Sequence, residues 1–300
     1  MQGTIIRAVA GFYYVYSGGT VYECRARGIF RKDGITPLVG DEVEMTVVAG
    51  PGQQPSASTP EMGVAAVDRI LPRLNSFERP PAANVELLVL VAAVKHPAPS
   101  FLMLDRVTVA ARKKGAELIL CVNKTDLAED EQIAELAEYY KNACVTHFIS
   151  VKDKKGVEAL KAAVKGKKAA LAGPSGAGKS SLANLLLGEQ RSITGDISRK
   201  LQRGRNTTRH TELFAGDGFF LFDTPGFTSF DALGIASDEV AELMPDIAPY
   251  AHSCRFSDCR HLAEPGCAVR QAVAAARISP GRYSSYVQIY KDALAAENKY

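Results

Sequence analysis

A glycine-rich stretch near the middle of the chain has the spacing of a phosphate-binding loop. It reads GPSGAGKS, the pattern Gly-x4-Gly-Lys-Ser, and stands between an apolar run and a helical pattern. Glycines let the backbone turn its N–H groups toward phosphate oxygens, and the start of the next helix adds positive potential. We expect Lys179 to reach the β- and γ-phosphates of a nucleotide and Ser180 to ligate Mg²⁺. The predicted phosphate site comprises Gly173, Pro174, Ser175, Gly176, Ala177, Gly178, Lys179, Ser180 and Ser181.

A second motif, upstream of the first, has the residues needed to read a base. The sequence CVNKTDL places Asn123, Lys124 and Asp126 after an apolar run. A carboxylate at Asp126 can accept from guanine N1–H and from the exocyclic amine, whereas adenine offers no such donors. Asn123 can bond the guanine edge and brace the phosphate loop, while the stem of Lys124 lies over the ring. Ser150 and Val151 follow the next predicted strand, where the Val151 N–H could meet guanine O6.

A third motif, Asp-Thr-Pro-Gly, follows the apolar run FFLF and supplies Asp223 and Gly226. An Asp at the end of a neighbouring strand is where a phosphate-loop enzyme holds its metal, here through water. The N–H of Gly226 could bond the γ-phosphate. A threonine between the phosphate loop and Asp223 should close on the metal when the γ-phosphate is present, and we expect it to be Thr208, with Thr207 as second choice. The predicted magnesium ligands are therefore Ser180, Thr208 and Asp223.

The segment that contains these threonines, residues 191–212, carries six basic residues against two acidic ones. Two interpretations stay open. A basic run can be a solvated loop, or it can be an arm that meets the phosphates of an RNA.

A cysteine-rich cluster near the end of the chain has the spacing of a metal site. Cys254, Cys259, His261 and Cys267 stand within fourteen residues. Three thiolates and one imidazole form a closed structural set for zinc, with no open position for a water nucleophile. We expect one structural zinc ion per chain.

The elements that position these motifs change character along the chain. Residues 1–48 alternate in the strand manner and predict a small closed barrel. Residues 50–61 resemble a mobile loop, and residues 71–84, with Pro80-Pro81, a linker without regular structure. Apolar runs then alternate with helical patterns, which predicts a mostly parallel sheet with helices on both sides. From residue 235 onward the pattern is helical.

Composition supports an ordinary globular protein. Of 300 residues, 46% are hydrophobic and 23% charged, and the net charge of +3 is too small to indicate a nucleic-acid binder by itself. We see no apolar run long enough to span a bilayer and no signal peptide. Half of the six cysteines belong to the cluster, which is metal-site usage in a reducing compartment and favours the cytoplasm.

The order of the motifs is reversed relative to an ordinary GTPase, because the base-reading loop precedes the phosphate loop. Joining the old termini and cutting the chain elsewhere would leave every loop in place, and such permutation is tolerated. With LPRLNSFERP, the permuted motifs and CRFSDCRHLAEPGC, the sequence resembles the circularly permuted GTPases. It is most similar to the ribosome small-subunit-dependent GTPase A family (RsgA, also called YjeQ or YloQ).

The resemblance covers essentially the whole chain and implies a multi-domain α/β protein. Its expected parts are an OB-fold RNA-binding domain at residues 1–75, a circularly permuted phosphate-loop GTPase domain at 76–232 and a helical zinc-binding domain at 233–300. It implies GTP hydrolysis to GDP and phosphate, stimulated by the small ribosomal subunit, in late subunit maturation. The expected partners are the small subunit and its 16S rRNA. We expect a monomer without membrane association.

The resemblance leaves the residue that positions the attacking water open. The family would offer a histidine just before the paired threonines, but this sequence has Asn206 there, with His210 four residues on. With Lys179, Thr208 and Gly226, Asn206 completes the predicted catalytic set. Two rivals remain at this point: an ATP-using phosphate-loop enzyme, which Asn123 and Asp126 argue against, and an RNA-binding assembly factor for which GTP is a structural ligand.

Overall fold

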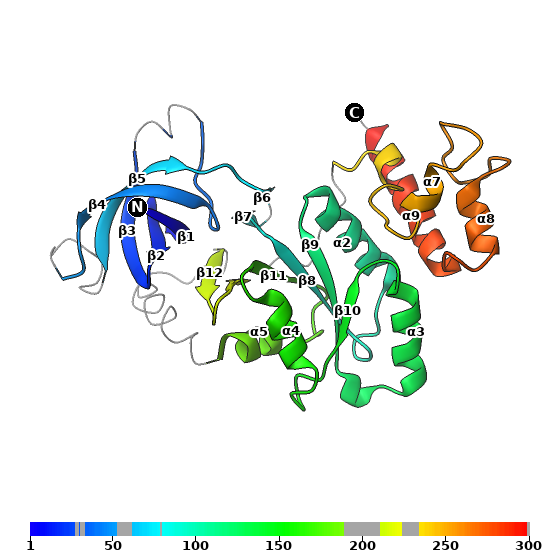
Figure 1. The fold of residues 1–300 in the computed structure, drawn as a ribbon, viewed down its shortest axis with the longest axis horizontal. Coiled ribbons are helices and arrows are strands. Elements are labelled where there is room, and N and C mark those ends of the chain that lie inside the picture. The colour runs from blue at the N-terminus through cyan, green and yellow to red at the C-terminus, as the bar shows by residue number, and fades with distance from the viewer. Residues whose placement is uncertain are drawn as a thin grey trace. The chain divides into compact units, whose positions relative to one another are not determined.

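The computed structural model describes residues 1–27, 30, 34–52, 62–78, 80–188, 211–223 and 234–298 (Figure 1). The chain folds into two compact units, and each unit draws on three separate stretches of sequence. Unit 1 takes Met1–Leu87, Lys161–Leu171 and Ser180–Phe227, and unit 2 takes Leu88–Leu160, Ala172–Lys179 and Thr228–Tyr300. No helix within these described ranges is both long and apolar enough to cross a membrane.

Unit 1 begins with a closed five-stranded barrel of the OB type. Its strands pair in the order β1-β2-β3-β5-β4, and β1 also pairs with β4, which closes the barrel. Alternate side chains point inward, so Ile5, Val15 and Val43 are fully buried. The strands are β1 (Gln2–Val9), β2 (Phe12–Ser17), β3 (Thr20–Ala26), β4 (Glu42–Ala49) and β5 (Gly63–Ile70). The sequence predicted the barrel, but it did not predict β5.

A short hairpin follows the barrel, where we expected a linker without regular structure. Strands β6 (Ser76–Glu78) and β7 (Pro81–Ala83) pair antiparallel, with Phe77 opposite Ala82. The expectation that Pro80-Pro81 forbids regular structure was therefore wrong. Proline is tolerated at the first residue of a strand, and Pro81 occupies that position in a ladder of only two strands.

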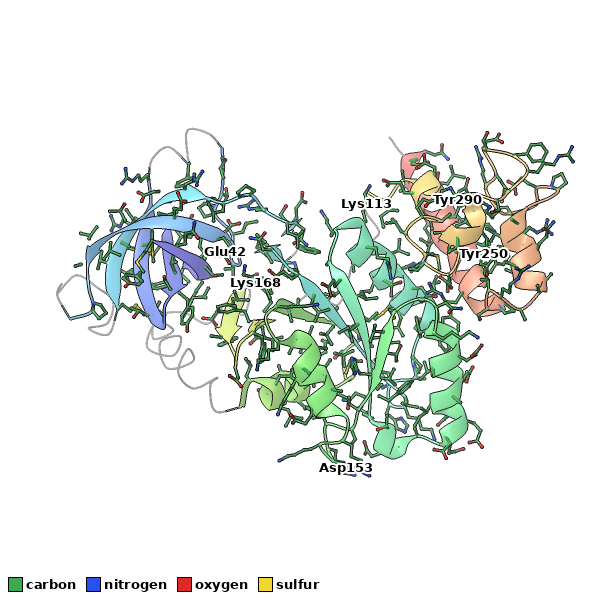
Figure 2. All side chains as sticks on the ribbon, in the orientation of Figure 1. Glu42, Lys113, Asp153, Lys168, Tyr250 and Tyr290 are labelled. Atoms are coloured by element: carbon green, nitrogen blue, oxygen red, sulfur yellow. The ribbon has the colours of Figure 1, made fainter. Side chains whose placement is uncertain are left out.

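The rest of unit 1 extends the barrel into a larger sheet. β11 (Lys168–Ala172) lies parallel to β13 (Phe220–Asp223), and β12 (Glu212–Ala215) joins β13 antiparallel and then pairs with β1. An ion pair across this junction joins Lys168 to Glu42, and the two residues are labelled near one another in Figure 2. The barrel therefore shares its hydrogen-bond ladder with the strand that leads into the phosphate loop.

Among the residues that the structure describes, unit 2 contains three strands in the order β10-β9-β8. All seven residues of β8 (Leu87–Ala93) are buried, as expected for a strand covered on both faces. β9 (Glu117–Asn123) and β10 (Val145–Phe148) pair in parallel. The helical elements that follow these strands are α2 (Phe101–Lys113), the 3-10 turn η1 (Thr125–Leu127) and α3 (Asp130–Tyr140). Helix α4 (Val157–Val164) and helix α5 (Lys179–Leu187) each continue from one unit into the other.

The C-terminal part of unit 2 is helical. It contains the 3-10 turn η3 (Ser237–Glu239) and the helices α7 (Ala248–Ala251), α8 (Ala268–Ala274) and α9 (Pro280–Glu297), the last three of which are orange to red in Figure 1. One hydrophobic core joins them to α2, because Val109 belongs to the same buried cluster as Met244, Ile289 and Tyr290. Helix α9 contacts both α2 and η3.

Candidate functional site

The phosphate-loop motif lies between strand β11 and helix α5, as its sequence context predicted. Gly173, Gly176 and Gly178 all have positive φ, at 127°, 80° and 99°. A Cβ on Gly173 would stand 2.0 Å from the carbonyl oxygen of Val91 in β8, and one on Gly178 would stand 2.3 Å from Nδ2 of Asn123. The loop is therefore pressed against its neighbours so closely that only glycine fits at both positions.

The cation of the loop is held by the loop itself. Lys179 Nζ donates to the carbonyl oxygens of Gly173 and Pro174, each at 2.8 Å. Burial lowers the pKa of this ammonium. Ser180 and Ser181 are exposed and lie in the first turn of α5, where N–H groups have no intrahelical partner. A helix start beside a lysine can bind the phosphates of an anion.

Asn123, the last residue of β9, joins three motifs that are far apart in the sequence. Its Nδ2 donates to the carbonyl oxygen of Ala177 at 2.9 Å, and its Oδ1 accepts from the N–H of Val151 at 3.1 Å. The expected brace between the base motif and the phosphate loop is therefore present. The Val151 N–H, for which we predicted guanine O6 as a partner, bonds Asn123 in this structure.

The carboxylate of Asp126 is fixed by the loop after β10. Ser150 Oγ donates to Asp126 Oδ1 at 2.8 Å and accepts from the N–H of Asp153 at 3.0 Å. Lys152 Nζ stands 3.7 Å from Asp126 Oδ2. The hydrogen bond from Ser150 is the main reason that the pKa of Asp126 lies below its usual value, and Lys152 lowers it further. An ionised carboxylate held in this way can accept two hydrogen bonds from a guanine edge.

Lys124 has a left-handed backbone, with φ 64°, and its ammonium donates to the carbonyl oxygen of His96. Sequence analysis did not identify His96 or the neighbouring Pro97 as site residues. One signal pointed to them: the turn sequence KHPAPS directly follows the buried strand β8. Loops at the carboxyl ends of adjacent parallel strands gather at one edge of a sheet, which is where such folds bind ligands.

The remaining predictions for the nucleotide site divide into two groups. Asp223 is the last residue of β13 in unit 1 and is exposed. Thr207, Thr208, Asn206, His210 and Gly226 lie outside the described residues, and their predicted roles stay predictions.

The cysteine cluster comes together as its spacing predicted. The ligand atoms of Cys254, Cys259, His261 and Cys267 all lie within 4.8 Å of one another. His261 Nδ1 is 3.4 Å from Cys254 Sγ and 3.6 Å from Cys267 Sγ, and those two sulfurs are 3.9 Å apart. Ligand atoms around a tetrahedral zinc ion are about 3.5–3.8 Å apart, so the cluster could hold such a metal ion.

The loop that carries the cluster ligands is fixed by hydrogen bonds to Glu264 and to helix α9. The carboxylate of Glu264 accepts from the N–H groups of Arg260, Leu262 and Ala263 at 2.8–3.0 Å. Burial opposes the charge, but these backbone donors outweigh it and lower the pKa of Glu264 to about 2. Tyr283 and Tyr286 of α9 donate to the carbonyl oxygens of His261 and Arg260. The loop is thereby tied to the longest helix of the unit.

Comparison with known proteins gives consistent matches along the whole chain. The family model for the RsgA GTPase matches residues 70–233, and that for the RsgA N-terminal domain matches residues 2–50. The small ribosomal subunit biogenesis GTPase RsgA of Agathobacter rectalis is 37% identical, with 100% of both chains covered. The protein of that name from Clostridium acetobutylicum is 39% identical, with 96% of each chain covered.

Two solved structures are similar over nearly the full length. The crystal structure of YloQ, described as a circularly permuted GTPase, matches with a TM-score of 0.81 and 34% identity over 98% of this chain and 95% of that one. YjeQ from Thermotoga maritima matches with a TM-score of 0.80 and 31% identity over 98% of each chain. Fold and motif order thus define a circularly permuted GTPase with an OB-type barrel. The chain belongs to the RsgA GTPase family.

Proposed function

We propose that this protein hydrolyses GTP to GDP and phosphate and couples that reaction to maturation of the small ribosomal subunit. The observation that carries the nucleotide part is the double hydrogen bond of Asn123, which joins the base motif to the phosphate loop and to the loop after β10. The subunit part rests on relatives named small ribosomal subunit biogenesis GTPase. The work would take place in the cytoplasm, with the 16S rRNA of the subunit as part of the binding surface.

In this proposal each described residue has a distinct role. Asp126, kept ionised by Ser150, accepts from guanine N1–H and N2–H, and the stem of Lys124 covers the ring. The backbone of the phosphate loop and Lys179 bind the β- and γ-phosphates. To do so, the Lys179 ammonium releases the carbonyl oxygens of Gly173 and Pro174 and donates to phosphate oxygens instead. Ser180, and Asp223 through water, would hold Mg²⁺, which neutralises charge on the phosphates.

The Cys3His cluster is proposed to bind one structural zinc ion. Burial raises the pKa of the Cys259 thiol to about 12, and a divalent cation reverses this by favouring the thiolate. Four protein ligands leave no position for a water nucleophile, so the ion would stabilise the loop and take no part in hydrolysis.

The predicted division into barrel, GTPase domain and zinc-binding domain is proposed as the arrangement that meets the subunit. The barrel strands β2 and β3 offer Arg25, which lies over the Phe12 ring at 4.8 Å. Exposed guanidinium groups on aromatic rings suit RNA contact. Of the aromatic side chains on these strands, Tyr13, Tyr16 and Tyr22 are half-buried, whereas Tyr14 belongs to the barrel core.

The test is co-sedimentation of the full chain with purified small subunits, in a non-hydrolysable GTP analogue and in GDP. We expect tighter binding in the analogue, because a switch ordered by the γ-phosphate adds contacts only in that state. Equal binding in the two nucleotides would contradict the coupling. Removal of residues 1–75 is not a suitable control, because β1 forms part of the sheet that contains β12. Arg25→Gln on the barrel surface is the better variant.

A further inference from the structure

The segment between β8 and α2 contacts both loops that form the proposed nucleotide site. The part that makes these contacts is its first four residues, Val94, Lys95, His96 and Pro97. The N–H of Val94 donates to the carbonyl oxygen of Asn123 at 3.0 Å, which extends the strand pairing to the start of the base motif. We refer to these four residues as the 94–97 segment.

The first contact is with the base motif. The ammonium of Lys124 donates to the carbonyl oxygen of His96, and both residues have left-handed backbones, with φ 64° and 53°. Non-glycine residues seldom adopt this conformation, so the two backbones are shaped to bring these groups together. The bond holds the flexible stem of Lys124 in one direction. His96 is exposed, and the group that it contributes to this contact is its backbone carbonyl oxygen.

The second contact is with the phosphate loop. Cδ of Pro97 lies 3.5 Å from the point where a Cβ on Gly176 would stand. That is an ordinary van der Waals distance, so the proline ring lies beside the phosphate loop at that glycine. A third link joins Lys95 Nζ to Glu129 at 3.2 Å, and Glu129 is the N-cap of helix α3, directly after the base motif.

We propose that the 94–97 segment is a positioning element of the nucleotide site, with the His96 carbonyl and Pro97 holding Lys124 against the face of the bound purine. The inference rests on the proposed function of that site. A stem fixed before the ligand arrives loses less conformational freedom on binding, so the segment acts by slowing nucleotide release. The nitrogen of Pro97 is bonded to the His96 carbonyl, so its ring restricts the backbone that carries this acceptor. Lys124 touches the ligand.

The test measures dissociation of a fluorescent GDP analogue from the full chain by stopped flow. Lys124→Met keeps the stem but removes the ammonium, and Pro97→Ala removes the ring beside Gly176. We expect each to speed release about 5- to 10-fold. Because both act through one link, the double variant should release no faster than the faster single variant. Pro99→Ala is the matched control, because it replaces the other proline between β8 and α2. It should release the GDP analogue at the wild-type rate.

Multiplicative effects in the double variant, or release from Pro99→Ala as fast as that from Lys124→Met, would overturn the proposal. Failure of the wild-type protein to bind the analogue at all would instead overturn the nucleotide site on which the proposal rests. Thermal unfolding of every variant identifies losses that come from misfolding.

Discussion

The Cys3His cluster and the proposed base-reading site, both in unit 2, reach a fixed geometry by different routes. The four ligands of the cluster lie within fourteen residues, and one loop brings them together. The base-reading site needs Asn123 and Ala177, which are 54 positions apart. The cluster would draw its stability from a bound ion, whereas the base-reading site depends on hydrogen bonds between loops. A change in the cluster can therefore unfold one loop and leave the rest of the chain folded. The base-reading site is lost only when the packing of several loops is lost.

The largest effect is expected at the cluster. Cys259→Ser removes one ligand, so the protein should lose its metal and the C-terminal helices should unfold locally. Structural zinc contributes about 10–16 kcal/mol of apparent binding free energy in small domains. Elemental analysis and hydrogen exchange over residues 234–298 measure both results. Cys144→Ser, which changes a cysteine outside the cluster, should keep one zinc per chain. Freshly purified wild-type protein without zinc would contradict the assignment.

Next in size is the loss of turnover at the phosphate loop. Lys179→Ala removes the cation and Ser180→Ala the proposed magnesium ligand, so GTP hydrolysis should become undetectable in each. Lys141→Ala removes a lysine whose described ion pair is with Glu138 on the surface of α3, and it should leave the rate unchanged. Full activity of either loop variant would place the nucleotide elsewhere.

A third region sharpens the comparison, because its buried charges are paired with one another. Arg282 of α9 is 1% exposed; it forms two 2.8 Å hydrogen bonds with Asp246 and an ion pair with Asp105 of α2. Burial alone would lower the pKa of Arg282, but the bonds to Asp246 and the charge of Asp105 raise it. Tyr139 and Tyr140 of α3 also donate to Asp105.

Arg282→Ala leaves two buried carboxylates without their partner and should cost about 3–5 kcal/mol in the free energy of unfolding. Arg106→Ala is the matched control, because it breaks a pair between the same two helices, Arg106 with Asp292, whose side chains are 40% and 39% exposed. That change should cost less than about 1 kcal/mol. Chemical denaturation measures both. Equal losses in the free energy of unfolding would show that burial does not increase the contribution of the Arg282 ion pairs to stability.

The smallest of these effects concerns the base. Asp126→Asn should weaken GDP binding about 10- to 100-fold, because guanine loses a charged acceptor. The same variant should gain affinity for xanthosine diphosphate, since the amide N–H₂ can donate to the carbonyl that xanthine carries at C2. Competition binding measures the two nucleotides side by side. Unchanged GDP affinity would remove Asp126 from the base site.

The sequence was most informative where chemistry and local spacing coincide. The glycine spacing of the phosphate loop, the four cluster ligands and the helical patterns of α2, α3 and α5 are all set by residues close together in the chain. The brace from Asn123 to Ala177 was predicted because two motifs of known geometry constrain one another.

The features that the sequence did not predict depend on distant pairing. Strand β5 completes the barrel by lying parallel to β3, with Tyr22 opposite Gly63, although β4 separates the two strands in the chain. The register of β1 on β12, with Arg7 opposite Glu212, spans most of the chain. Likewise, Asp105 on an apolar helix face gives no sign that its partner is Arg282, 177 positions later.

The most direct test of the central claim is GTP turnover by the full-length protein with and without purified small ribosomal subunits. The account predicts a slow intrinsic rate that rises several-fold or more on addition of subunits, because ordering of the active site is coupled to subunit binding. Lys179→Ala should show no turnover in either condition. An equal rate of wild-type hydrolysis with and without subunits would contradict the account.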